Sequence, residues 1–110
     1  MNKFGAKKTT IAGIVFDSKR EAQRYAELVL LERAGKIRGL QRQVQFQLAP
    51  KVKINGEKRQ RPALRYTADF EYYEAGYRVV EDIKGAITQT FRIRQHLMKT
   101  VHGIDVRVVK

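Results

Sequence analysis

Residues 64–84 read LRYTADFEYYEAGYRVVEDIK, and this stretch decides the fold of the chain. Two runs rich in aromatic and β-branched residues flank a short glycine-containing connection, which is the pattern of a β-hairpin. Because side chains alternate between the two faces of a strand, Tyr66 is expected on one face and Asp69 on the other. A two-residue loop at residues 75–76 would place Asp69 opposite Asp82.

Two facing carboxylates need a positive charge nearby. Like charges directly opposite each other destabilise a sheet, and Lys84 lies two residues after Asp82 on the same predicted face. A bound divalent cation between Asp69 and Asp82 would remove the remaining repulsion. A three-residue loop would instead shift the pairing by one residue, so the facing arrangement is a hypothesis.

Composition limits the class of protein. The 110 residues are expected to form one domain, and they contain no cysteine, which excludes disulfides and thiolate metal sites. The net charge of +12 favours a polyanionic partner, and DNA is the expected one. No apolar run is long enough to span a membrane and no signal-peptide core is present, so a cytoplasmic protein without a membrane partner is expected.

Helix and strand signals surround the hairpin. Ser18 followed by Glu21 fits a capping box at a helix start, and residues 1–10 are expected to be a mobile basic arm. A strand that follows a helical crossover usually runs parallel to its neighbour, which predicts an α/β domain with a mixed sheet. The expected order is helix, three strands, helix and strand, at residues 18–34, 40–48, 64–73, 77–84, 88–102 and 104–108.

Several kinds of chemistry are excluded by what the chain lacks. The two histidines, His96 and His102, both fall on the second predicted helix, and their spacing does not suit two zinc ligands on successive turns. A nucleophilic serine turn is missing. A glycine-rich phosphate loop is missing too, so no nucleotide cofactor is expected.

The remaining candidates for chemistry are Asp69, Asp82 and Lys84, with Glu21 as an outlying fourth. Carboxylate oxygens suit Mg²⁺, and a lysine beside them could orient a water or stabilise negative charge during phosphodiester hydrolysis. The alternatives are a surface ion pair between the strands and a purely structural helix-capping role for Glu21.

These residues carry a resemblance. Asp69, followed on the next strand by Asp82-Ile83-Lys84, is similar to the site of the PD-(D/E)xK nuclease superfamily, although Ala68 stands where that motif has proline. Glu21 matches the additional glutamate of Holliday junction resolvases in that superfamily. The string GIVFDSKREAQRY at residues 13–25 also resembles a small phage and prophage family of nuclease-like proteins.

The resemblance implies a restriction-endonuclease-like αβββαβ core and a metal-dependent endodeoxyribonuclease. Glu21, Asp69 and Asp82 would hold Mg²⁺, with Mn²⁺ able to substitute, and Lys84 would act on the attacking water. Branched DNA such as a Holliday junction would be the substrate of a homodimer encoded by a phage or prophage. The alternatives are a nicking, mismatch or restriction-type duplex nuclease and a non-catalytic DNA-binding protein of the same fold. The expected DNA contacts are Lys7, Lys8, Lys19, Arg92, Arg94 and Lys99.

Overall fold

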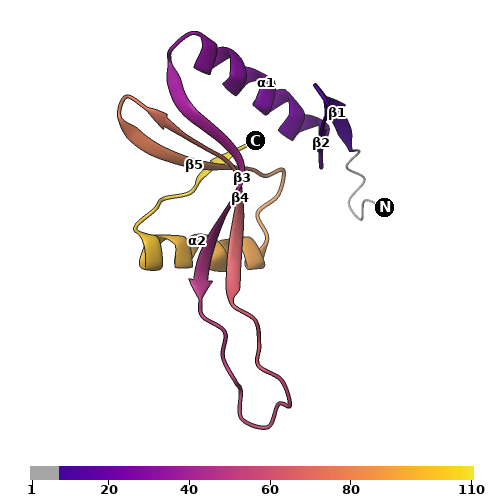
Figure 1. Cartoon of the computed structure of the whole chain (residues 1–110), viewed down its shortest axis with the longest axis vertical. Helices are drawn as coiled ribbons and strands as arrows, with labels where there is room; N and C mark the ends of the chain where they lie inside the picture. Colours follow the sequence, from indigo (N-terminus) through magenta and orange to yellow (C-terminus); the bar gives the residue numbers. More distant parts are fainter. Residues whose placement is uncertain (1–7) are drawn as a thin grey trace. The chain divides into compact units, whose positions relative to one another are not determined.

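The computed structural model describes residues 8–110, and Figure 1 shows its elements. Two compact units form: one contains the residues up to Leu40 together with Tyr72–Arg78, and the other contains Gln41–Glu71 and Val79–Lys110. In chain order the elements are β1 (Thr9–Ile11), β2 (Ile14–Phe16), α1 (Lys19–Arg33), β3 (Ile37–Ala49), β4 (Leu64–Glu74), β5 (Tyr77–Ile83), α2 (Gln89–His102) and β6 (Arg107–Val109).

The first unit begins with a small hairpin that the sequence did not predict. β1 and β2 pair antiparallel, with Thr9 opposite Phe16. Residues 9 and 10 therefore lie in a strand, and their assignment to a mobile arm is wrong. The rest of the predicted arm, residues 1–7, lies outside the described residues. Ala12 and Gly13 form the two-residue connection, both with positive φ, as a tight hairpin turn requires.

Helix α1 begins where its cap predicts. The Ser18 side chain accepts a hydrogen bond from the backbone N–H of Glu21 at 3.1 Å, which satisfies one of the free donors at the helix start. Leu28 and Ala22 are buried on this helix, and the ring of Tyr25 lies 5.2 Å from that of Phe16. Burial of this apolar face supplies more stability than the helical propensity of so short a segment.

The larger sheet has the strand order β3-β4-β5-β6. β5 and β6 run parallel, with Glu81 opposite Arg107 and Asp82 opposite Val108. The predicted parallel final strand is confirmed, and the chain is an α/β protein with a mixed sheet. Neither helix among the described residues is long and apolar enough to cross a membrane.

In the second unit, helix α2 packs against the sheet. Its N-cap is Thr88, whose hydroxyl accepts from the Phe91 N–H at 3.1 Å, and it ends at Gly103 with a left-handed φ of 70°. Phe91 and Met98 are buried on α2 and belong to a hydrophobic core that includes residues of the strands. The other buried members of this core are Phe46, Leu48, Tyr66, Ala68, Val80 and Val106.

Candidate functional site

Asp69 and Asp82 lie next to each other on the neighbouring strands β4 and β5. The backbone N–H of Asp69 donates to Asp82 Oδ1 at 3.3 Å, and the backbone N–H of Ile83 donates to Asp69 Oδ2 at 2.8 Å. β4 and β5 are joined by the predicted two-residue loop, in which Ala75 and Gly76 both have positive φ. Asp69 and Asp82 are therefore close to each other, and these backbone donors offset part of the repulsion between their carboxylates. That the two carboxylates face each other across the strands stays a prediction.

Tyr66 is a third member of this cluster that sequence reasoning missed. Its hydroxyl donates to Asp82 Oδ2 at 2.8 Å, and both residues are buried, with relative exposures of 3% and 2%. Burial raises the pKa of Tyr66 well above its usual value, and the negative charge of Asp82 and its hydrogen bond raise it further. The phenol therefore remains a proton donor to Asp82 throughout the physiological pH range.

The Tyr66 contact corrects one prediction about the hairpin. Strict alternation along the two strands would put Tyr66 and Asp82 on opposite faces of the sheet, yet their side chains are bonded to each other. Tyr66 also shares a core with Val80, whose side chain was expected on the Asp69 face. The simple two-residue period therefore holds only over part of the hairpin.

Lys84 lies at the margin of the cluster. Its Nζ is 3.5 Å from Asp82 Oδ2 and 5.0 Å from the centre of the Phe91 ring, so it contacts both the carboxylate and a face of α2. Its backbone N–H donates to Val109 O at 2.9 Å, through which β6 fixes the end of β5. About one third of the side chain is exposed, which leaves the ammonium group accessible to a ligand in solvent.

Glu81 and Glu21 complete the set of candidate acids. Glu81, the residue before Asp82, is completely buried. Asp82 makes the contacts with Tyr66 and Lys84. Glu21 is buried on α1, in the first unit, and its role as a metal ligand stays a prediction. Within residues 8–110, no three His, Cys, Asp or Glu side chains are grouped so that they could hold a metal ion.

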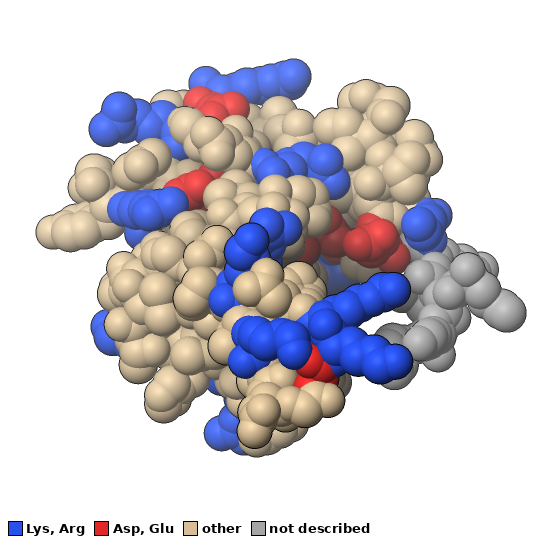
Figure 2. Space-filling model, turned by 60° about the horizontal axis from the view of Figure 1, so that its bottom comes forward, with Lys and Arg blue, Asp and Glu red and all other residues tan. Residues whose placement is uncertain are grey.

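The expected DNA-contacting cations are spread over several elements. Lys7 lies outside the described residues, while Lys8 and Lys19 are exposed in the first unit. On α2, Arg92 and Arg94 are exposed, and the positive charge of Arg94 is close enough to lower the pKa of Tyr66, against the larger effects that raise it. Lys99 is exposed and paired with Asp105 at 2.7 Å. Figure 2 shows one face of the molecule on which Lys and Arg outnumber acidic side chains.

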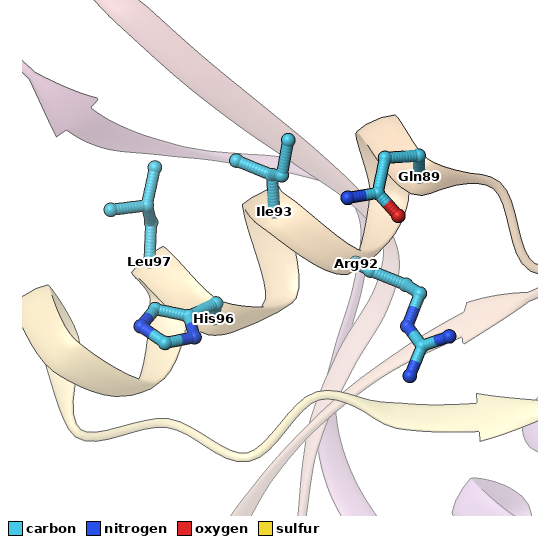
Figure 3. Close-up of a pocket in the computed structure, with 5 residues that line it drawn as sticks. All are labelled: Gln89, Arg92, Ile93, His96 and Leu97. Atoms are coloured by element: carbon cyan, nitrogen blue, oxygen red, sulfur yellow. The ribbon is translucent and has the colours of Figure 1, made fainter.

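An open hollow of about 510 Å³ is lined by residues of α2, and neither aspartate lines it. Figure 3 shows Ile93 and Leu97 projecting to one side of the helix and Arg92 to the other. Gln89 and His96 complete the lining, so the hollow contains no carboxylate. Its lining offers no acidic ligand for a metal ion. Asp69, Asp82 and Lys84, three of the residues predicted from the sequence, lie close together in the second unit.

Comparison with models of protein families identifies the family of this chain. A family model described as "Protein of unknown function (DUF1064)" covers residues 1–109, which is nearly the whole chain. The chain belongs to the DUF1064 family. No curated protein and no solved structure matches it.

Proposed function

We propose that this DUF1064 protein is a Mg²⁺-dependent DNA endonuclease that hydrolyses phosphodiester bonds in branched DNA such as Holliday junctions. The observation that carries the proposal is the neighbouring pair of Asp69, which is partly buried, and Asp82, which is buried. Each accepts a hydrogen bond from a backbone N–H of the other's strand, and the Lys84 ammonium lies 3.5 Å from Asp82. The net charge of +12 supports a polyanionic substrate.

The donor set fits Mg²⁺. Two carboxylates provide hard oxygen ligands, and Mg²⁺ commonly keeps several waters and takes only one or two carboxylates from the protein. Each carboxylate has about four acceptor positions, so the hydrogen bonds to Asp69 and Asp82 are compatible with coordination. The same chemistry suits Mn²⁺. Glu21 is proposed as a third ligand on the strength of the sequence resemblance.

Each residue of the cluster has a distinct task under this proposal. Asp69 and Asp82 hold the ion, and Tyr66 fixes the orientation of the Asp82 carboxylate through its 2.8 Å hydrogen bond. When bound, the ion lowers the pKa of a coordinated water and polarises the phosphate. Lys84 would orient the attacking water or stabilise negative charge on the phosphate oxygens.

Branched DNA is proposed because Glu21 resembles the additional glutamate of Holliday junction resolvases. A junction is resolved by two symmetric cuts, and a homodimer with two-fold symmetry would supply two such sites. A nicking, mismatch or restriction-type nuclease acting on linear duplex is the alternative within the same chemistry.

A non-catalytic DNA-binding protein is the second candidate function. It is favoured by the lack of a three-ligand metal grouping within residues 8–110. The contacts of the Asp82 carboxylate are also consistent with it, because this group accepts a hydrogen bond from Tyr66 and lies within ion-pair distance of Lys84. Under this reading the cluster is a structural network at the end of the hairpin.

A cleavage assay separates these possibilities. A labelled four-way junction and a linear duplex of matched sequence are each incubated with the protein and either Mg²⁺ or a chelator. Cutting of the junction alone, and only with Mg²⁺, is the expected result. Equal cutting of both substrates would assign the protein to the duplex nucleases, and binding without any cutting would support the non-catalytic alternative.

A further inference from the structure

A basic ribbon extends from the sheet between β3 and β4. We call residues 50–63 the ribbon; Figure 1 shows them reaching beyond the ends of both strands. Val52 and Arg61 form an antiparallel bridge, with backbone hydrogen bonds of 3.1 and 2.7 Å in the two directions. One antiparallel bridge therefore joins the two arms of the ribbon near its base.

The turn at its tip is well defined. The Glu57 N–H donates to Ile54 O at 3.0 Å, and Gly56 has a φ of +92° while Asn55 does not enter the positive-φ region. A positive φ at the third turn position alone is the signature of a type II turn, which favours glycine there. The tip thus has a fixed backbone conformation.

Both prolines of the chain mark the limits of the ribbon. Pro50 follows the last residue of β3, and Pro62 lies shortly before the first residue of β4. Proline has no N–H to donate to a sheet ladder and restricts the residue before it. The two prolines therefore separate the ribbon from the sheet and stiffen its base.

The ribbon concentrates positive charge. Residues 51–61 carry five basic side chains and one acidic side chain, a net charge of +4 in a chain whose total is +12. The single acid, Glu57, is bound by the Arg61 guanidinium at 2.6 and 2.9 Å, and its backbone carbonyl accepts from Lys53. Within the described part of the chain, Lys51, Lys58 and Arg59 are exposed and make no ion pair.

We infer that the ribbon binds the backbone of B-form DNA along a groove, as a contact separate from the Asp69–Asp82 cluster. The major groove of B-form DNA is wide enough for a two-stranded β-ribbon, whereas that of A-form RNA is too narrow for protein side chains to enter. When unpaired basic side chains of the ribbon contact phosphates, counterions condensed on the DNA are released. This release provides the driving force for binding.

A membrane surface is a poorer fit. Exposed apolar side chains on the ribbon are limited to Val52 and Ile54 among a majority of charged and polar residues. Surface-bound segments bury a substantial apolar face into the lipid, which these two side chains cannot supply. The inference shares with the proposed function the premise that the partner is DNA, but it does not depend on cleavage.

Equilibrium binding of a fluorescent linear duplex, in chelator, tests the ribbon. The variant Lys58→Gln/Arg59→Gln removes two unpaired charges from it. The matched control Arg33→Gln/Lys36→Gln removes one Arg and one Lys from exposed positions in the first unit. Each lost phosphate contact lowers the slope of log K against log salt by about 0.9 and weakens binding several-fold at physiological salt.

We expect the ribbon variant to bind roughly 10- to 30-fold more weakly than the wild type at 0.15 M salt, with the slope reduced by about 1.8. The control should stay within about twofold, and both variants should keep the wild-type melting temperature. Equal weakening in both variants would overturn the inference, as would wild-type affinity in the ribbon variant. Equal affinity for an A-form RNA duplex would refute the B-form groove.

The assay also distinguishes this inference from the proposed function. If DNA binding depends on the ribbon but no substrate is cleaved, the proposed role of the ribbon is supported and the proposed nuclease activity is refuted. If the ribbon variant instead binds DNA as the wild type does and shows normal Mg²⁺-dependent cleavage, the nuclease proposal is supported and the role of the ribbon is refuted.

Discussion

The aspartate cluster and the ribbon use charge in opposite ways. Asp82 is almost fully buried, and hydrogen bonds from Tyr66 and the Asp69 backbone fix its carboxylate. The ribbon's Lys58 and Arg59 are exposed and unpaired within the described residues. A buried charge held by neighbours keeps one geometry, which suits an ion or a reacting group. Exposed charges adapt to an irregular polyanion and act mainly through their number.

Removing the charge of Asp82 should distinguish the role of the aspartate cluster in cleavage from the role of the ribbon in DNA binding most clearly. Asp82→Asn is expected to lower DNA cleavage by about a hundredfold or more, because a proposed metal ligand is lost. DNA affinity should change little, since it depends on the exposed cations. Gel-based cleavage and fluorescence binding measure the two effects. Asp105→Asn, at an exposed position paired with Lys99, is the control.

If Asp82→Asn cleaves as fast as the wild type, the buried cluster has no part in chemistry. If it loses binding and cleavage together, the cluster and the ribbon are not functionally separable.

Substitution of Lys84 tests whether its amine takes part in the reaction or only neutralises the negative charge of Asp82. Lys84→Gln should reduce the cleavage rate about a hundredfold, as expected for loss of a group that assists proton transfer or stabilises charge. Mg²⁺ affinity should remain close to that of the wild type. Lys36→Gln, which removes an exposed charge far along the sequence, is the matched control for net charge. A rate within twofold of the wild type would restrict Lys84 to an ion pair with Asp82.

Substitution of Tyr66 should lower the stability of the folded protein more than its affinity for DNA. Tyr66→Phe removes a buried hydrogen bond to a charged acceptor and should lower the free energy of unfolding by about 2 kcal/mol at pH 7. Urea denaturation measures this change. Tyr77→Phe is the control, because Tyr77 is 76% exposed. Equal small effects of both substitutions would mean that the Asp82 contact contributes nothing to stability.

The pH dependence of the Tyr66 variant has a definite sign. The folded-state pKa of Tyr66 is raised, so its contribution is fully present below the unfolded value near 10 and is lost as pH rises above that value. The stability gap between the wild type and Tyr66→Phe should therefore shrink above pH 10, by up to about 1.4 kcal/mol per pH unit. A gap that stays constant between pH 9 and 11 would contradict the raised pKa.

Local signals in the sequence predicted most of the larger elements. Ser18 and Thr88 mark the helix starts because each hydroxyl accepts a specific backbone N–H. Ala75 and Gly76 form the expected two-residue turn, which explains why the closeness of Asp69 and Asp82 was predictable. β1 was missed because three residues give too short a pattern to recognise.

The role of Tyr66 could not be predicted in the same way. Its contact with Asp82 depends on a break in the alternation of faces along the hairpin, which is a property of the assembled sheet and not of either strand alone. The hydroxyl of a tyrosine in a strand carries no sequence signal for the carboxylate it will meet. A buried tyrosine hydroxyl usually has a hydrogen-bond partner. This general rule predicts a partner for Tyr66 but does not say that the partner is Asp82.

Divalent-ion binding by Asp69 and Asp82 is tested most directly by titrating the protein with Mn²⁺ and following the free ion by electron paramagnetic resonance. The wild type should take up Mn²⁺ saturably and release it to excess Mg²⁺, whereas Asp69→Asn and Asp82→Asn should each bind at least tenfold more weakly. Asp105→Asn should bind as the wild type does. A wild-type protein that takes up no Mn²⁺, or variants that bind it equally well, would contradict a metal site at these two aspartates.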